Sequence, residues 1–279
     1  MSHIDDLPPL RDVIAEYGLA AKKHLGQNFL LDLNITMKIA RAAGDLSEVT
    51  VLEIGPGPGG LTRALLANGA KRVVAIERDE RCLPALQQIV GASDERLTIV
   101  SGDAMILDHQ EVLEDAGVDG PVHIAANLPY NIATPLFIGW ICGRSYPPFW
   151  RGMTLMFQKE VAQRITARSD DKAWGRLGVL ASWRCNTDIL FDLHPQAFTP
   201  PPKVISSVVT VEPKAEPLAA DIGKLERITQ AAFGQRRKML RQSLKQLGGH
   251  ALLDSVGIDD TARAEELTME QFISLANAI

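Results

Sequence analysis

The stretch from Val51 to Thr62 limits the possible folds of this chain more than any other. A short apolar run leads into four closely spaced glycines, and leucines then return at helical spacing: the glycines are Gly55, Gly57, Gly59 and Gly60. This pattern predicts a strand, a tight loop and a helix. Because glycine has no Cβ, such a loop lets a ligand approach the backbone, with the N–H groups of the following helix directed toward it. The stretch therefore predicts a site for a nucleotide-type ligand.

Further strands are expected at residues 72–76, 97–100, 122–126 and 153–157, with helical patterns between most of them. Alternation of this kind indicates βαβ units, a parallel sheet and an α/β, Rossmann-like fold. Residues 177–183 and 187–190 fit either two strands or a helix and a strand. Residues 198–203 read as a rigid, exposed polyproline stretch before a strand at 204–211.

Two acids follow predicted strands. Glu77 lies 22 positions after Gly55 and directly after the second strand, where Rossmann-type sites place the acid that accepts hydrogen bonds from a ribose diol. Asp103 follows the third strand. Because the carboxyl ends of parallel strands share one edge, we expect both carboxylates to lie beside the glycine loop.

The fourth strand runs directly into Asn127-Leu128-Pro129-Tyr130, the most informative tetrapeptide of the chain. The Asn127 side chain carries an acceptor oxygen, and Pro129 favours an extended bend in which the Leu128 carbonyl can point the same way. Two such acceptors can bind an exocyclic amine, and the Tyr130 ring can stack on a purine. Acceptors on an adenine N6 favour the pyramidal nitrogen of the transition state over the planar ground state. The tetrapeptide therefore predicts methylation of an adenine amine without a general base.

The C-terminal part differs from the rest in pattern and charge. Residues 213–217 read as a linker and residues 218–279 as a helical domain, after an N-terminal helical extension (1–19) and a main domain (20–212). The chain has a net charge of −5, yet residues 227–253 contain six basic residues and no acid. A localised basic face on an acidic protein indicates a docked polyanion.

Composition narrows the remaining classes. With 279 residues and 46% hydrophobic content the chain can bury a large core, but its longest apolar runs fall short of a membrane helix and its first residues do not read as a signal peptide. We therefore expect a cytoplasmic protein with no membrane partner. Its three cysteines and six histidines show no metal-ligand spacing, which predicts reduced thiols and no metal.

Four ordered motifs together resemble the ribosomal RNA adenine N6-dimethyltransferases. They are Leu25 to Leu30, Glu53 to Gly59, Asn127 to Tyr130 and Phe198 to Val204, and the likeness continues through Ala232 to Arg241. The resemblance is greatest to the bacterial enzymes that dimethylate two adjacent adenosines near the 3′ end of 16S rRNA. It implies a class I methyltransferase that uses S-adenosylmethionine, acts on the small (30S) subunit or its precursor during ribosome biogenesis, and is a monomer.

The resemblance also assigns site residues. It implies cofactor contacts at Asn28, Leu30, Gly55, Gly57, Glu77, Asp103 and Asn127, with Asp103 reading the adenine amino group of the cofactor. It places the target base against the catalytic tetrapeptide, with Phe198 as a second stacking wall. It implies that Arg236, Arg237, Lys238 and Arg241 lie on one helix that docks rRNA.

Other functions fit parts of the sequence. Gly55, Gly57, Gly60 and Glu77 also satisfy the fingerprint of a nicotinamide-dependent oxidoreductase, although no hydride-transfer partner is evident. A DNA adenine methyltransferase would share the chemistry. A non-catalytic assembly factor of the small subunit would share the fold.

Overall fold

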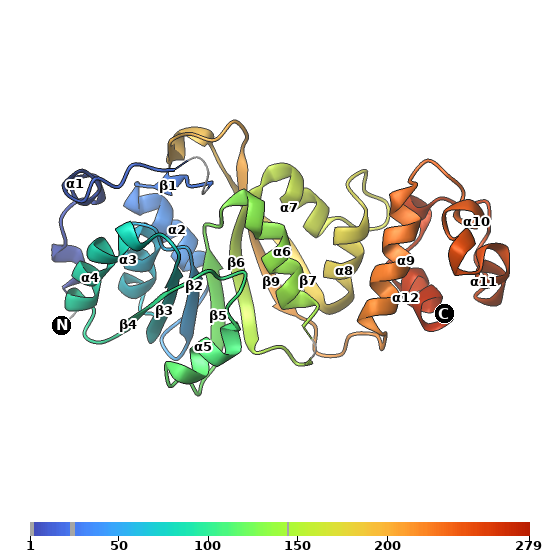
Figure 1. Cartoon of the computed structure of the whole chain (residues 1–279), viewed down its shortest axis with the longest axis horizontal. Coiled ribbons are helices and arrows are strands. Elements are labelled where there is room, and N and C mark those ends of the chain that lie inside the picture. Colours follow the sequence, from blue (N-terminus) through green and yellow to red (C-terminus); the bar gives the residue numbers. More distant parts are fainter. Residues whose placement is uncertain (1–2, 23–25, 144) are drawn as a thin grey trace. The chain divides into compact units, whose positions relative to one another are not determined.

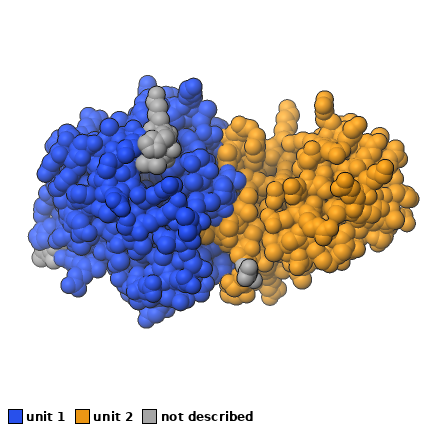
Figure 2. Space-filling view, in the orientation of Figure 1, with its two compact units in different colours: residues 1–137, 148–159, 189–212 blue, residues 138–147, 160–188, 213–279 orange. Residues whose placement is uncertain are grey.

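The computed structural model describes residues 3–22, 26–143 and 145–279. Leu25, the first residue of the first motif, lies outside the described residues, as do Lys23 and His24. The chain forms two compact units (Figure 2). Unit 1 contains residues 1–137, 148–159 and 189–212, and unit 2 contains residues 138–147, 160–188 and 213–279. Unit 2 thus includes segments on both sides of the expected linker, and the division at 213–217 stays a prediction.

A seven-stranded sheet runs in the order β4-β3-β2-β5-β6-β9-β7 (Figure 1). The strands are β2 (Thr50–Ile54), β3 (Arg72–Glu77), β4 (Leu97–Ser101), β5 (Val122–Ala126), β6 (Trp150–Gln158), β7 (Cys185–Leu193) and β9 (Ser206–Pro213). Strands β4, β3, β2, β5 and β6 are parallel, and β9 pairs antiparallel with β6. The chain order reverses between β2 and β5, where open α/β sheets bind ligands at the carboxyl ends of their strands.

The central strands are apolar because they are covered on both faces. Every residue of β2 and β5 is buried, and the core around them takes side chains from α2 (Leu33–Ala42), α3 (Gly60–Ala67) and α4 (Leu83–Ala92). The short helix α5 (His109–Asp115) precedes β5. The expected strands at 72–76, 97–100, 122–126 and 153–157 are all present, and the α/β reading is confirmed.

The N-terminal extension packs onto unit 1. Helix α1 (Leu10–Glu16) buries Leu10 and Val13, and the Arg63 guanidinium of α3 donates a 2.7 Å hydrogen bond to the Pro8 carbonyl. Leu10 also lies behind the glycine loop, since a Cβ placed on Gly60 would approach its side chain to 3.1 Å. The extension therefore supports the loop from behind.

A two-stranded ribbon joins two distant parts of the chain. Strand β1 (Phe29–Leu30) pairs antiparallel with β8 (Phe198–Thr199), so that Phe29 lies opposite Thr199. The segment from residue 200 to 205 follows without regular structure, and β9 begins two residues later than expected. Apart from the half-buried Pro202, this segment is exposed.

Unit 2 holds α8 (Arg176–Arg184), α9 (Ile222–Gly234), α10 (Leu240–Ser243), α11 (Gly249–Ser255) and α12 (Met269–Asn277). Boundaries between the units pass within α6 (Tyr130–Ile141), α7 (Lys159–Thr166) and β7, and before the last residue of β9. The Trp174 indole donates to the Leu267 carbonyl, and the Phe233 and Phe272 rings lie 5.3 Å apart. From residue 222 onward the described regular elements are all helical, and residues 176–193 form a helix followed by a strand.

The expected basic helix at 236–241 is wrong. Helix α9 ends at Gly234, residues 235–239 form turns, and α10 begins only at Leu240. Gln235 leaves helical geometry, and the Arg236 guanidinium donates to the Trp174 carbonyl at 2.9 Å. These contacts bend the chain where sequence periodicity alone predicts a continuous helix.

No helix in the described ranges has the length and apolar character needed to cross a bilayer. Within those ranges no group of three or more His, Cys, Asp or Glu side chains is arranged to hold a metal ion.

Candidate functional site

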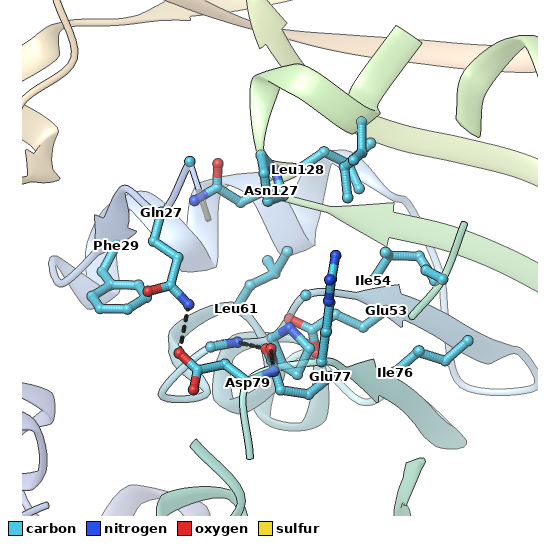
Figure 3. A pocket seen from close by; sticks show the side chains of 18 of the residues that line it. Gln27, Phe29, Glu53, Ile54, Leu61, Ile76, Glu77, Asp79, Asn127 and Leu128 are labelled. Carbon is cyan, nitrogen blue, oxygen red and sulfur yellow. Dashed lines mark hydrogen bonds between the residues drawn. The ribbon is translucent and has the colours of Figure 1, made fainter. Parts of the chain in front are cut away.

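A cavity opens at the carboxyl ends of β2, β3, β4 and β5 (Figure 3). Its wall contains all of the residues expected to bind the cofactor and all four members of the tetrapeptide: Asn28, Leu30, Gly55, Gly57, Glu77, Asp103, Asn127, Leu128, Pro129 and Tyr130. All of these belong to unit 1. The sheet thus brings together residues that lie up to 102 positions apart.

The glycine loop forms the floor of the cavity with a backbone that only glycine adopts easily. Gly55, Gly57 and Gly59 have φ angles of 68°, 56° and 92°. A Cβ on Gly57 would also lie 3.1 Å from the Phe29 ring. Glycine is therefore required here both for conformation and for close packing.

Glu77 holds the loop in place. Its Oε2 accepts the Gly57 N–H at 2.8 Å, and its Oε1 accepts the Asp79 N–H at 2.7 Å. Burial raises the pKa of this carboxyl, and these backbone hydrogen bonds counteract the rise. Each carboxylate oxygen has a second lone pair, so Glu77 can still accept from hydroxyl groups of a ligand.

Glu53 is a functional candidate that the sequence reasoning did not single out. It is fully buried near the end of β2, lines the cavity, and accepts a 2.7 Å hydrogen bond from the Thr62 hydroxyl of α3. Burial raises the pKa of Glu53 to about 8. The available signal was an acid inside an otherwise apolar central strand, which is costly unless the group has a partner or a role.

Two further carboxylates, Asp103 and Asp79, have partners at the border of the cavity. The Asp103 carboxylate lies 2.9 Å from the Arg78 guanidinium and also accepts the Met105 N–H at 3.0 Å. The Gln27 amide donates to Asp79 at 2.9 Å, the contact drawn as a dashed line in Figure 3. Hydrogen bonds from Arg81 hold the pKa of Asp79 at about 2.

The Asn127 side chain has a defined orientation. Its amide nitrogen donates to the Asn28 carbonyl at 3.0 Å, and an amide oxygen in that place would face another acceptor. Oδ1 therefore points away from Asn28 and has no hydrogen-bond partner among the described residues. Among the residues that the structure describes, no group donates a hydrogen bond to the Leu128 carbonyl. Two acceptors thus remain available for a donor.

Tyr130 begins α6 at the wall of the cavity. Its hydroxyl shares a 2.7 Å hydrogen bond with the hydroxyl of Ser206, the first residue of β9. Burial raises the pKa of Tyr130, so the phenol stays protonated at neutral pH.

Phe198 lies elsewhere. Its side chain is 3% exposed, belongs to the hydrophobic core and does not line the cavity. The expectation that residues 198–203 are exposed is wrong for this residue, because the β1–β8 pairing draws it inward opposite Leu30. In this conformation Phe198 supports the ribbon rather than offering a stacking face.

The four basic residues expected to dock RNA belong to unit 2, outside the cavity. Arg236 bonds Glu265 at 2.7 Å and Arg241 lies 3.7 Å from Asp260. The side chains of Arg237 and Lys238 are exposed and have no hydrogen-bond or ion-pair partner among the described residues. Only these two cations are unengaged within the predicted docking segment.

The model of the ribosomal RNA adenine dimethylase family matches residues 18–279. The chain belongs to this dimethylase family. It is 63% identical over 277 residues to the ribosomal RNA small subunit methyltransferase A of Mesorhizobium japonicum, covering 99% of both chains. It is 60% identical to the enzyme of the same name from Agrobacterium fabrum over the full length of both. Residues 1–17 precede the family match but lie within the full-length alignment to the Agrobacterium fabrum enzyme.

Solved structures agree with the dimethylase assignment. The dimethyladenosine transferase of Plasmodium falciparum superimposes with a TM-score of 0.74 at 26% identity, covering 88% of this chain and 94% of that one. The 23S rRNA methyltransferase ErmE gives 0.66 at 25% identity, covering 90% and 99%. The family resemblance and the class I methyltransferase fold inferred from the sequence are confirmed.

Proposed function

We propose that this dimethylase transfers methyl groups from S-adenosylmethionine to N6 of two adjacent adenosines near the 3′ end of 16S rRNA, in the small ribosomal subunit or its precursor. One observation carries the proposal. The hydrogen bond from the Asn127 amide to Asn28 leaves the Asn127 oxygen free to accept, and the nearby Leu128 carbonyl is free as well. The full-length relatives named small subunit methyltransferase support the choice of substrate. That substrate places the reaction in the cytoplasm.

The cavity suits a cationic nucleoside better than a dinucleotide. Glu77, Asp79 and Asp103 line it, together with Glu53, whose raised pKa keeps it largely protonated at neutral pH, whereas Arg78 is the one basic residue among the described lining residues. A pyrophosphate needs donors and positive charge, while a sulfonium and an ammonium group favour acids. This charge distribution argues for S-adenosylmethionine and against a nicotinamide cofactor.

The residues present fit that cofactor in outline. The cofactor would lie against the backbone of the glycine loop at Gly55 and Gly57, with Asn28 and Leu30 on the adjoining wall of the cavity. Glu77 would accept from the ribose hydroxyls, and Asp103 from the adenine amine. When bound, S-adenosylmethionine supplies an electrophilic methyl group.

The protein would activate the adenine amine by placing hydrogen-bond acceptors around N6. Asn127 Oδ1 and the Leu128 carbonyl would accept the two N6 hydrogens and so favour a pyramidal nitrogen whose lone pair is available for attack. Tyr130 would stack on the base and hold N6 in line. Attack on the methyl group moves the positive charge from sulfur to N6, and this cationic nitrogen is acidic, so its proton can pass to water without a tuned base. For the second transfer one hydrogen remains, and one acceptor suffices.

The experiment that tests this function is methyl transfer from labelled S-adenosylmethionine to small subunits that lack the modification. Free rRNA and duplex DNA serve as parallel substrates, and nucleoside mass analysis identifies the product. Dimethyladenosine from subunits alone supports the proposal. Methylated DNA, or no transfer despite cofactor binding, contradicts it, and the second result favours a non-catalytic assembly factor.

A further inference from the structure

Ser206 stands outside the cavity wall, yet it touches the catalytic tetrapeptide. Its hydroxyl lies 2.7 Å from the Tyr130 hydroxyl, and its side chain is fully buried. The two residues are 76 positions apart, so the bond forms only in the folded protein. Because Ser206 is buried, its hydroxyl is costly to leave without a partner.

The backbone holds Ser206 from both sides. Ser206 pairs with Gln158 at the start of the antiparallel β6–β9 ladder, and the neighbouring Ile205 carbonyl accepts the Lys159 N–H at 2.9 Å. The Ser206 hydroxyl is thus a fixed point. Tyr130, in contrast, is the first residue of α6 and is only half-buried, so its ring needs an anchor.

The exposed segment 200–205 lies between β8 and Ser206. Strand β8 pairs with β1, and Asn28, whose carbonyl accepts the Asn127 amide, directly precedes β1. One end of the segment is thus followed by the residue that bonds Tyr130, and the other end is preceded by a strand that supports the neighbour of Asn28.

We propose that Ser206 is a positioning residue for methyl transfer: its hydroxyl fixes the Tyr130 ring as the platform on which the target adenine stacks. The inference rests on the proposed function for its catalytic consequence, but not for the orientation of Tyr130. Ser206 itself touches neither substrate nor cofactor. Its loss leaves the acceptors of Asn127 and Leu128 in place and lets the stacked base move relative to them.

The adjacent Ser207 is a matched control. It is equally buried and its hydroxyl donates to Asp192 at 2.7 Å, but it faces the other side of the sheet, as successive strand residues do. Ser206→Ala and Ser207→Ala therefore remove the same atom from the same strand. A general loss of stability would affect both variants, whereas loss of base positioning would affect only the first.

The kinetic test compares Ser206→Ala, Tyr130→Phe, the double variant and Ser207→Ala on small subunits. We expect each of the first two to lower kcat about three- to tenfold, the size of one lost hydrogen bond, with the affinity for S-adenosylmethionine unchanged. The double variant should lose no more than either single one, because both remove the same bond. The proportion of monomethylated product should rise. Additive losses, or equal losses in Ser207→Ala, would overturn the proposal.

A second readout is independent of activity. The chain has only three tyrosines, so 3-fluorotyrosine labelling gives a ¹⁹F NMR spectrum in which Tyr17 and Tyr146 act as internal references. Ser206→Ala should shift or broaden the Tyr130 resonance alone, and Ser207→Ala should leave it unchanged. An unchanged Tyr130 signal in Ser206→Ala overturns the positioning role even if the enzyme methylates a different substrate. Failure of the wild-type protein to methylate subunits would instead count against the proposed function.

Discussion

At the scale of single residues, the site depends on groups that are held by hydrogen bonds and can still accept a hydrogen bond from a ligand. Asn127 donates to Asn28 and keeps its oxygen free, and Glu77 accepts from the glycine loop with one oxygen and from the Asp79 N–H with the other while retaining lone pairs. Neither role requires a proton transfer within the site. The chemistry therefore rests on fixed acceptors rather than on titration.

Asn127→Ala should reduce turnover by at least about 100-fold, a loss typical of removing one oriented polar group from a transition-state site. The affinity for small subunits should change little, because the basic residues expected to contact RNA lie in unit 2. Single-turnover methylation and filter binding measure the two quantities. If methylation proceeds normally, the proposed mechanism is wrong.

Glu53 predicts a pH dependence of stability. Its pKa is about 8 in the folded protein against 4.5 in the unfolded chain, so folding favours the protonated acid. The stabilisation is complete below pH 4.5 and is lost as the pH rises toward 8, with a limiting slope of about 1.4 kcal/mol per pH unit. Glu53→Gln imitates the protonated form and should lack this loss.

Urea unfolding of both proteins at several pH values measures the difference. We expect the wild-type protein to lose stability relative to Glu53→Gln between pH 5 and pH 8, by an amount of order 1–3 kcal/mol. Stability curves that run parallel over this range would show that Glu53 does not titrate there.

At the scale of elements, the glycine loop and the turn before α10 illustrate opposite uses of irregular backbone. The loop is rigid, with three positive φ angles and close contacts to Phe29 and Leu30. The turn at 235–239 instead presents exposed cations between two helices. One element shapes a cavity and the other presents charge.

Gly57→Ala should weaken the binding of S-adenosylmethionine by tenfold or more. The new methyl group meets the Phe29 ring at 3.1 Å, and any shift moves the N–H that Glu77 accepts. Gly69→Ala is the control, since Gly69 has a φ of 89° but nothing within 4 Å of its Cβ position. It should cost only about 1 kcal/mol of stability from backbone strain. Calorimetric titration with S-adenosylmethionine measures the affinity of both variants. Equal affinities of Gly57→Ala and Gly69→Ala would contradict the close-packing argument.

The basic turn leads to a sharper prediction than the sequence allowed. Replacing Arg237 and Lys238 with alanine should weaken subunit binding and reduce the slope of log K against log salt by about 2, one for each cation. Arg236→Ala should mainly lower the melting temperature, because Arg236 bonds Glu265 and the Trp174 carbonyl. A salt slope that falls only for Arg236→Ala would reverse this assignment.

At the scale of the whole molecule, the cofactor cavity and the basic residues expected to dock RNA belong to different compact units. The cavity is lined entirely by unit 1, while Arg237 and Lys238 belong to unit 2. Hydrogen exchange should therefore show protection by S-adenosylmethionine at residues 53–61, 76–79, 102–104 and 127–132, with little change in α9 to α12. NAD should give no protection. Protection by NAD, or protection by S-adenosylmethionine confined to unit 2, would refute the assignment.

The sequence located the parts of the site that follow from strand order. Glu77, Asp103 and Asn127 each come after a strand of one parallel sheet, so a single topological rule places them together. Glu53 and Ser206 escaped notice because their partners, Thr62 and Tyr130, are set by tertiary packing rather than by local pattern.

The errors have the same origin. An aromatic residue before a proline run reads alike whether it is exposed or, as with Phe198, drawn into the core by a distant strand. Likewise, the spacing of Leu240, Leu244 and Leu247 predicts one continuous helix, while Arg236 is held by a carbonyl 62 positions earlier in the chain. Local periodicity carries no information on such contacts.

The orientation of the Asn127 amide has a consequence for fidelity. Asn127 Oδ1 and the Leu128 carbonyl are both hydrogen-bond acceptors. If guanosine or inosine occupied the target position, they would face the lone pairs of a keto group. Such a base would leave both acceptors unsatisfied in a partly desolvated site, a penalty that enzymes use to reject near-identical substrates. A subunit whose target adenosine had been deaminated would thus be left unmodified. Methylation would therefore depend on the identity of the base as well as on its position.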